Sequence, residues 1–310
     1  MSESRLESLL RNGEFVVCGE MAPPTGASKE PIQRKSDYFK GFVDAVNLTD
    51  NATGIVRLSS IMSSVFLSEC GLEPIMQMTC RDRNRIGLQS DALGANAAGI
   101  KNLLCLTGDY QTFGNHPGAK GVFDLDSVQL IKTMDDLNKG LFLSGDEVKP
   151  PTQLFIGGGE NPFAEPMDLR IMRLGKKIWA GAKFIQTQPV FDLPRFKKWF
   201  SLVRKEGYHE LAYIIAGVMP VRSAKALLYM QESVPGMSIS KEYIERMQST
   251  EDPKEEGVKI CVEIIEELKN IDGICGVHIM PVMWESITSR IVNDAGLLPR
   301  PSIPLNLEVK

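Results

Sequence analysis

The sequence lacks the features that mark several common classes of protein. None of its 310 residues belongs to an uninterrupted run of about 18 apolar residues, the length that a membrane-spanning helix needs. The first residues also lack the apolar core of a signal peptide. With a formal net charge of -4, the chain has no basic excess with which to bind nucleic acid. We therefore expect a cytoplasmic protein that has neither a membrane nor a nucleic acid as its main partner.

Several catalytic and metal-binding motifs are absent as well. The chain has no P-loop, no Gly-x-Gly-x-x-Gly between a first strand and its helix, and no Gly-x-Ser-x-Gly. Its six cysteines are scattered without a Cys-x-x-Cys pair, which predicts reduced, mostly buried thiols. Cys275-x-x-His278 is only half of a metal site, and its apolar flanks favour a buried core histidine. We predict no metal site.

Short apolar runs alternate with amphipathic stretches along the whole chain. This pattern is typical of βαβ units and a parallel sheet. The predicted strands are 15–20, 43–49, 73–79, 101–107, 152–157, 183–188, 212–218 and 275–281. The predicted helices are 29–41, 57–70, 83–99, 125–138, 166–180, 193–206, 222–233, 240–248, 253–270 and 284–295. Eight strands predict a single-domain (β/α)₈ TIM barrel over residues 1–310, with an extended tail at about 299–310. An open doubly wound sheet is the alternative.

Polar residues end most of these apolar strands. Glu20 and Asp109 each follow a buried run, and the carboxyl ends of parallel strands meet at one mouth. Two carboxylates that converge there suggest acid–base chemistry. Gly157-Gly158-Gly159 after the fifth strand allows close backbone approach to a flat ring or a phosphate, or forms a plain turn. Of two long loops, 109–121 belongs to the mouth, whereas 140–151 would lie on the opposite face.

Three other features have a simpler structural interpretation. The charged run from Arg81 to Arg85 opens a helix, which favours a solvated capping region over an anion-binding edge. Phe196 and Phe200 lie four residues apart, at helical spacing, and are predicted core residues. Met172 and Trp179 lie inside helices and are also interpreted as packing residues.

Several motifs together resemble those of the methylenetetrahydrofolate reductase family, over about residues 15–300. The motifs are Gly19-Glu20-Met21-Ala22-Pro23-Pro24, Asn47-Leu48-Thr49, Gln77-Met78-Thr79-Cys80, the strand Asn102–Asp109, and the segment Ala180–Gln188 followed by Phe191-Asp192. The resemblance implies a (β/α)₈ barrel with a flavin, FAD or FMN, in its mouth. It also implies hydride transfer from reduced flavin to 5,10-methylenetetrahydrofolate, giving 5-methyltetrahydrofolate.

The resemblance also assigns roles to individual residues. Glu20 is similar to the general acid that opens the folate ring, and Asp109 to the aspartate beside the flavin and the pterin. Gln188 matches a pterin-contacting glutamine. The implied flavin contacts are Thr49, Gln77, Thr107, Gly108, Asp109, Phe123, Gly158 and Lys177, with Lys177 as a phosphate partner. A glutamate that acts as an acid near neutral pH needs an apolar site to raise its pKa, and Met21-Ala22-Pro23-Pro24 could supply one.

The chain departs from the family pattern at three positions. Ala224 stands where an aromatic residue is expected, Thr107 where arginine is frequent, and Gln77 where histidine is frequent. These departures raise the hypothesis that electrons arrive not directly from NAD(P)H but through a partner redox subunit, in an oligomer or hetero-complex. Two alternatives stay open: a pterin-binding barrel methyltransferase, and a flavin-free scaffold subunit of a redox complex.

Overall fold

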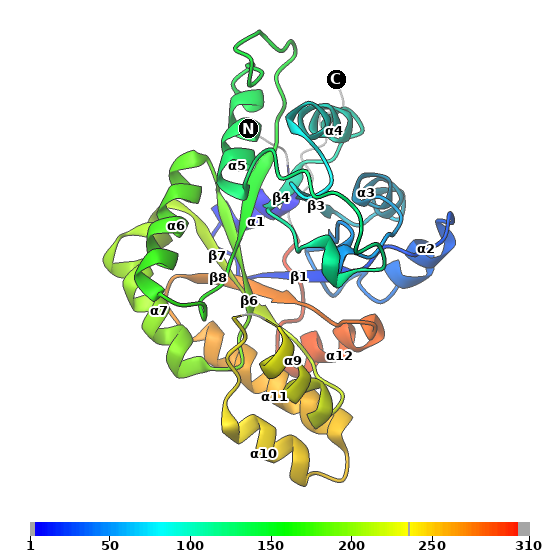
Figure 1. Ribbon diagram of the computed structural model, residues 1–310. Helices are drawn as coiled ribbons and strands as arrows, with labels where there is room; N and C mark the ends of the chain where they lie inside the picture. Colours follow the sequence, from blue (N-terminus) through cyan, green and yellow to red (C-terminus); the bar gives the residue numbers. More distant parts are fainter. Residues whose placement is uncertain (1–3, 235, 303–310) are drawn as a thin grey trace.

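A closed barrel of eight parallel strands forms the centre of the molecule, with β8 pairing back to β1 (Figure 1). The computed structural model describes residues 4–234 and 236–302. The strands are β1 (Val16–Met21), β2 (Ala45–Leu48), β3 (Pro74–Thr79), β4 (Asn102–Leu106), β5 (Phe155–Glu160), β6 (Phe184–Pro189), β7 (Tyr213–Val218) and β8 (Ile274–Ile279). The predicted (β/α)₈ TIM barrel is confirmed, and the open sheet is excluded.

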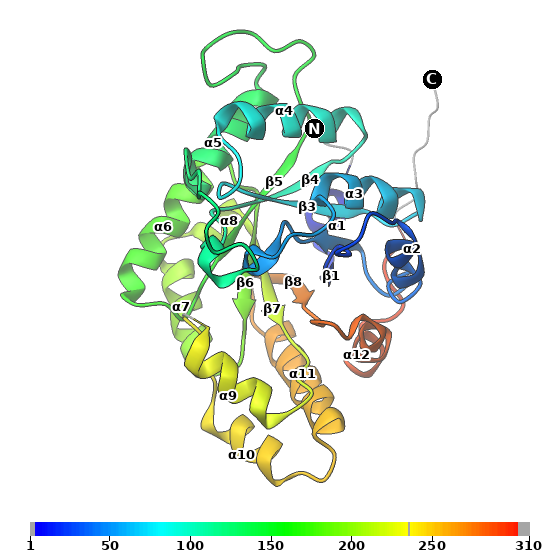
Figure 2. The ribbon, with the colours of Figure 1, turned by 45° about the vertical axis from the view of Figure 1, so that its right-hand side comes forward.

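Helices surround this barrel, and all but the first of the principal ones lie on its outer face (Figures 1 and 2). They are α1 (Arg5–Arg11), α2 (Glu30–Ser36), α3 (Ser60–Glu69), α4 (Arg85–Ala97), α5 (Ser127–Asn138), α6 (Met167–Ala180), α7 (Leu193–Lys205), α8 (Tyr208–Leu211), α9 (Ala224–Ser233), α10 (Lys241–Ser249), α11 (Pro253–Lys269) and α12 (Thr288–Asp294). Short 3₁₀ turns are η1 (Ala52–Gly54), η2 (Gln111–Phe113) and η3 (Glu285–Ile287). The helix predicted over 29–41 is wrong at its end: α2 stops at Ser36, and the chain then turns through Gly41 at a φ of 79°.

The strands alternate between an inner and an outer core, as strand geometry requires. On β1, Val16 and Cys18 belong to the cluster inside the barrel, whereas Val17 and Met21 belong to the larger cluster between strands and helices. Glu20, two residues beyond Cys18, therefore sits on the inward side. Phe155 on β5 and Phe184 on β6 stack inside the barrel at 5.1 Å between ring centroids.

Helix α1, which the sequence pattern did not predict, closes the N-terminal end of the barrel. Leu6, Leu9 and Leu10 are buried and join the interior cluster. Ser4 caps the helix, and the carboxylate of Glu73 accepts hydrogen bonds from the backbone N–H groups of Arg5 and Leu6. The barrel thus has an apolar floor on this side, and its polar side chains collect at the other end.

Two predicted segments lie outside the barrel. The loop over 140–151 precedes β5, contains an antiparallel bridge between Leu141 and Glu147, and projects beyond α5 (Figure 1). Most of the tail predicted at about 299–310 lies outside the described residues. Within the described part of the chain, no helix has the length and apolarity to cross a membrane.

Candidate active site

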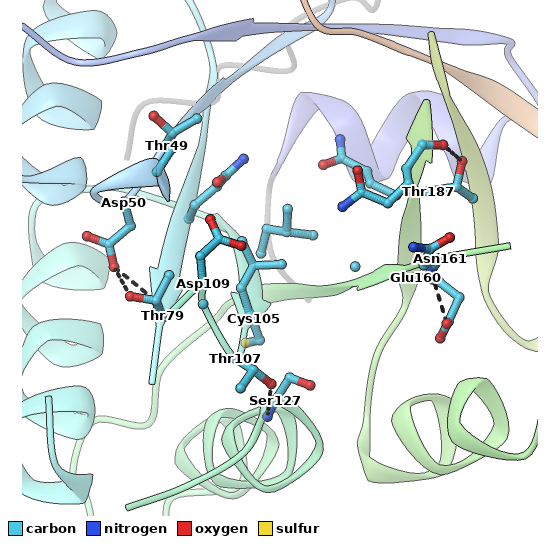
Figure 3. Close-up of a pocket in the computed structure, with 18 of the residues that line it drawn as sticks. Thr49, Asp50, Thr79, Cys105, Thr107, Asp109, Ser127, Glu160, Asn161 and Thr187 are labelled. Atoms are coloured by element: carbon cyan, nitrogen blue, oxygen red, sulfur yellow. Dashed lines mark hydrogen bonds between the residues drawn. The ribbon is translucent and has the colours of Figure 1, made fainter. Parts of the chain in front are cut away.

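A pocket of about 460 Å³ occupies the C-terminal end of the barrel, within the range of roughly 300–1,000 Å³ that small-molecule sites usually have. Its walls come from the ends of β1 to β6 and β8 and from the helices that follow β4 and β5. In Figure 3, Thr49, Asp50 and Thr79 lie on one side of the pocket, and Glu160, Asn161 and Thr187 on the other. The pocket therefore has the position at which TIM-barrel enzymes carry their active sites.

Glu20 lies on the pocket wall between two polar neighbours. The amide of Gln77 donates a hydrogen bond to Glu20 Oε2 at 3.2 Å, and His278 Nε2 lies 3.5 Å from the same oxygen. Burial raises the pKa of Glu20 to about 7, although the Gln77 amide opposes this change. Burial lowers the pKa of His278, so the imidazole is neutral near pH 7. Glu20 can therefore carry or release a proton in the neutral range.

Asp109 reaches the same pocket by way of a turn that needs glycine. Gly108 has a φ of 92°, and a Cβ there would lie 3.0 Å from Thr79 Cβ and 3.2 Å from Arg81 Cβ. The Asp109 side chain is exposed at the rim, and its Oδ2 accepts a hydrogen bond of 3.0 Å from the backbone N–H of Thr53. The two acids thus differ: the side chain of Glu20 is half-buried in the wall, at 20% exposed, and that of Asp109 is exposed at the rim.

The solvated cap predicted for Arg81 to Arg85 is wrong for Arg81 and Arg83, which are buried and half-buried behind the rim of the pocket. Arg81 is only 2% exposed, and it donates hydrogen bonds to the backbone oxygens of Asn51 (3.0 Å) and Asp109 (3.2 Å). Arg83 pairs with both oxygens of Asp50, at 2.7 and 3.1 Å. These arginines tie the rim loops after β2, β3 and β4 together, because the loops bring buried carbonyls and a buried carboxylate within their reach.

Three cations of α6 line the pocket, and they differ in their availability. Lys177 is buried, lies 2.8 Å from the carboxylate of Glu160 and donates to the backbone oxygen of Gly159. Its charge is therefore compensated by the protein. Arg173 and Arg170 lie one and two turns earlier on the same face of the helix. Arg173 lies 3.9 Å from the carboxylate of Asp126, and Arg170 Nε is buried without a hydrogen-bond partner among the described residues. An anionic group in the pocket would meet these two arginines.

Comparison with known proteins shows the family of the chain. A family model described as methylenetetrahydrofolate reductase matches residues 5–296. The chain belongs to this family. It is 28% identical over 281 residues to methylenetetrahydrofolate reductase 2 of Saccharomyces cerevisiae, covering 86% of this chain and 44% of the yeast protein. It is 23% identical over 292 residues to methylenetetrahydrofolate reductase 1 of Schizosaccharomyces pombe, covering 91% and 46%.

A solved structure shares the fold of this family member. It is an uncharacterized protein from Clostridium thermocellum that binds two copies of 5-methyl-5,6,7,8-tetrahydrofolic acid. The TM-score is 0.69 at 19% sequence identity, and the match covers 95% of this chain and 99% of that one. The two yeast relatives are longer: the chain spans less than half the length of each.

Most of the residues that the family resemblance singled out lie together. The pocket is lined by Glu20, Thr49, Gln77, Thr107, Gly108, Asp109, Lys177 and Gln188. Phe123 and Gly158 are not among its lining residues. Phe123 packs edge-on against Tyr110 at 5.7 Å, and a Cβ on Gly158 would point toward Ile131 of α5, at 3.1 Å. Gly159, the next residue along β5, is the one that faces the pocket.

Three pocket residues were given no place in the site by the sequence reasoning. His278 is buried, as predicted for a core histidine, yet it also faces Glu20. Gln186, by contrast, belongs to the polar strand end Gln186-Thr187-Gln188 that the sequence places at the mouth, and it lines the pocket together with Gln188. Arg170 and Arg173 precede Lys177 by seven and four residues, a spacing that would have placed all three on one side of a helix.

Proposed function

We propose that this chain reduces 5,10-methylenetetrahydrofolate to 5-methyltetrahydrofolate with a bound flavin, FAD or FMN. The observation that carries the proposal is the position of Glu20, a carboxyl with a pKa of about 7, in the mouth pocket of a barrel of this family. The names of the relatives and the folate bound by the Clostridium thermocellum protein support it. The chain spans less than half the length of each yeast relative. The activity named for those proteins is therefore a proposal for this chain.

The pocket residues fit a flavin. Gly159 presents bare backbone, and a Cβ there would lie 2.9 Å from Leu106 Cδ2, so this wall suits a flat ring. The buried hydroxyl of Thr49 has no partner within the described part of the chain and could bond to the ring system. Arg170 and Arg173 would hold the phosphate, in place of the already paired Lys177. When bound, the reduced flavin supplies the hydride.

The residues of the chain supply the acid and the orientation. Glu20 gives a proton to the aminal nitrogen of the substrate, and the carbon–nitrogen bond breaks with its electron pair moving to that nitrogen. The one-carbon unit is left as an iminium, which becomes the methyl group when it accepts a hydride. Gln188 and Asp109 hold the pterin by hydrogen bonds, with the carboxylate accepting from ring N–H groups. His278, neutral beside Glu20, faces the same carboxyl and can orient it through its ring nitrogen, while the proton of Glu20 is replaced from solvent.

We expect the purified chain to bind FAD or FMN and to show the visible spectrum of a flavoprotein. Alanine at both Arg170 and Arg173 should weaken flavin binding by about 10- to 100-fold, the scale of a lost charge-assisted hydrogen bond. Lys176→Ala is the matched control, because Lys176 lies on the same helix and lines a groove on its outer side. Fluorescence titration measures the affinity. A chain that takes up neither flavin would contradict the proposal and favour a pterin-binding methyltransferase or a scaffold subunit.

The same protein tests the electron donor. We propose that electrons come through a partner redox subunit, because Ala224 begins α9 where the family resemblance implies an aromatic stacking residue. Anaerobic mixing of the flavin-loaded chain with NADH or NADPH should then leave the flavin oxidised, whereas dithionite reduces it. Rapid bleaching by either nucleotide would remove the reason for a partner.

The rate of folate reduction should fall as the pH rises above about 7. Only protonated Glu20 can act as the acid, and with a pKa of about 7 its protonated fraction drops about tenfold for each further pH unit. The measurement is single-turnover oxidation of the reduced flavin by 5,10-methylenetetrahydrofolate between pH 6 and about 9. The expected profile is flat below the pKa and decreasing above it. A profile with no decrease in the alkaline range would contradict the role of Glu20.

A further inference from the structure

Gln186 is a buried amide that the proposed chemistry does not use. Its side chain is 3% exposed, it lines the pocket, and neither Nε2 nor Oε1 has a hydrogen-bond partner among the described residues. Buried polar groups are nearly always paired, and one left unpaired costs about 1–3 kcal/mol. A buried pocket amide whose donor and acceptor atoms are both unpaired within the described residues therefore indicates a functional role, such as binding a water or a ligand.

The surroundings of this amide place it beneath Glu20. The strand registers place Gln186 level with Ile215 on β7 and with Gly276 on β8, whereas His278, two residues further along β8, is level with Cys18 on β1. Cys18 precedes Glu20 by two residues on β1 and shares its inward face. Gln186 thus lies one layer below the carboxyl.

A third polar group completes this layer. His278 on β8 is 3% exposed, its Nε2 has no hydrogen-bond partner within the described part of the chain, and the same atom lies 3.5 Å from Glu20 Oε2. Unpaired donors and acceptors from β6 and β8 therefore face the underside of one carboxyl. Two to four polar partners are what a buried water needs.

We propose that Gln186 is a positioning residue for Glu20: together with His278 it holds a water beneath the carboxyl, and that water directs the Glu20 proton toward the mouth. The inference rests on the proposed role of Glu20 as the acid. The amide lies at the floor of the pocket, below Glu20 and above Cys18, which does not line the pocket.

Other charged groups of the pocket are already occupied or remote from this layer. The titratable and charged groups that line the pocket besides Glu20 and His278 are Asp50, Arg81, Cys105, Asp109, Glu160, Arg170, Arg173 and Lys177. Burial raises the pKa of the Cys105 thiol, so it stays neutral. Asp50 is paired with Arg83, and Glu160 with Lys177. Asp109 is at the exposed rim.

The test is a pH titration of Glu20 in the ligand-free chain. Infrared difference spectroscopy monitors the carboxyl band, and the loss of that band in Glu20→Gln assigns it to Glu20. Gln186→Met keeps the size of the side chain and removes its polar atoms. We expect the midpoint to rise by about one pH unit, because the ionised carboxylate loses a polar neighbour and its water. In the flavin-loaded enzyme, kcat should fall about tenfold with KM for the folate changed less than about twofold, and the alkaline limb of the pH profile should move with the midpoint.

Two further variants make the result decisive. Ile215→Met is the matched control, since Ile215 is the register partner of Gln186 on β7 and belongs to the interior cluster. It should change neither the midpoint nor kcat. Gln186→Asn keeps an amide and should give an intermediate shift, which also serves if Gln186→Met does not fold.

An unchanged midpoint in a folded Gln186 variant would overturn the inference. A raised KM with an unchanged midpoint would overturn it as well, because it would make Gln186 a ligand contact. Full activity of Glu20→Gln would instead refute the proposed role of Glu20 as the acid, and a chain that binds no flavin would refute the proposed function. In either case the ligand-free titration would still decide whether Gln186 and Glu20 are coupled.

Discussion

Glu20→Gln is expected to leave flavin binding intact and to lower turnover of 5,10-methylenetetrahydrofolate by about a hundredfold or more, the scale of lost acid catalysis. Glutamine has nearly the same shape and can still accept the hydrogen bond from Gln77, but it has no proton to give at neutral pH. The loss should appear in kcat rather than in the affinity for the folate, since the proton is needed only as the carbon–nitrogen bond breaks. Stopped-flow oxidation of reduced flavin by the folate measures it.

A matched control separates this effect from a general change of charge. Glu14 is an exposed glutamate just before β1, and Glu14→Gln should have the wild-type rate. Glu20→Asp keeps the acid but withdraws it by one methylene, so part of the activity should remain. If Glu20→Gln turned over the folate at near-normal rate, another group would have to be the acid.

The fold was predictable because its main signal is repeated along the chain. The barrel strands are four to six residues long and most of them begin with an apolar run, and their alternation with helices is readable from the sequence. Helix α1 was not predicted, because its seven residues span two turns and give too little periodicity. Its role depends on contacts with Phe155, Phe184 and other residues distant in sequence, which no local pattern records.

The site was predictable as far as it consists of strand ends. Strand polarity alone brought Glu20 and Asp109 to one pocket, together with their neighbours from β2, β3 and β6. Which carboxyl is buried could not be predicted, because burial depends on the neighbouring strands. The hydrogen bonds of Arg81 could not be predicted for the same reason, because its partners lie 28 and 30 residues away in the sequence.

Helix faces were less predictable than strand ends. Phe196 and Phe200 are buried as predicted, at 0% and 2% exposed. Met172 and Trp179 were wrongly interpreted as packing residues: they are 49% and 70% exposed, on the outer side of α6. The inner face of α6 is occupied by Ile171, Leu174 and Ile178, so these two larger side chains fall on the solvent side. Hydrophobicity alone does not distinguish the two faces of a helix that carries apolar residues on both.

Asp50→Ala is expected to lower the free energy of unfolding by about 3–5 kcal/mol, the usual effect of removing one partner from a buried ion pair. The side chain of Asp50 is fully buried, and it holds four hydrogen bonds: two from Arg83, at 2.7 and 3.1 Å, and two from the backbone N–H and hydroxyl of Thr79, at 2.9 and 3.0 Å. Without it, the Arg83 guanidinium keeps only Asp91 as an ion-pair partner within the described residues. Urea denaturation of the ligand-free chain measures the change.

Two comparisons show whether the weakened pairing of the Arg83 charge is the cause. Glu267→Ala removes an exposed carboxylate that pairs with Lys197 at 2.7 Å, and it should change the stability by less than about 1 kcal/mol. The double variant Asp50→Ala/Arg83→Ala should recover part of the loss, because the guanidinium that Asp91 alone would balance is removed together with Asp50. A double variant less stable than Asp50→Ala alone would mean that packing at the rim, and not charge, accounts for the effect. Because Asp50 and Thr79 both line the pocket, the single variant should also weaken flavin binding, which links the stability of the rim to the function proposed for it.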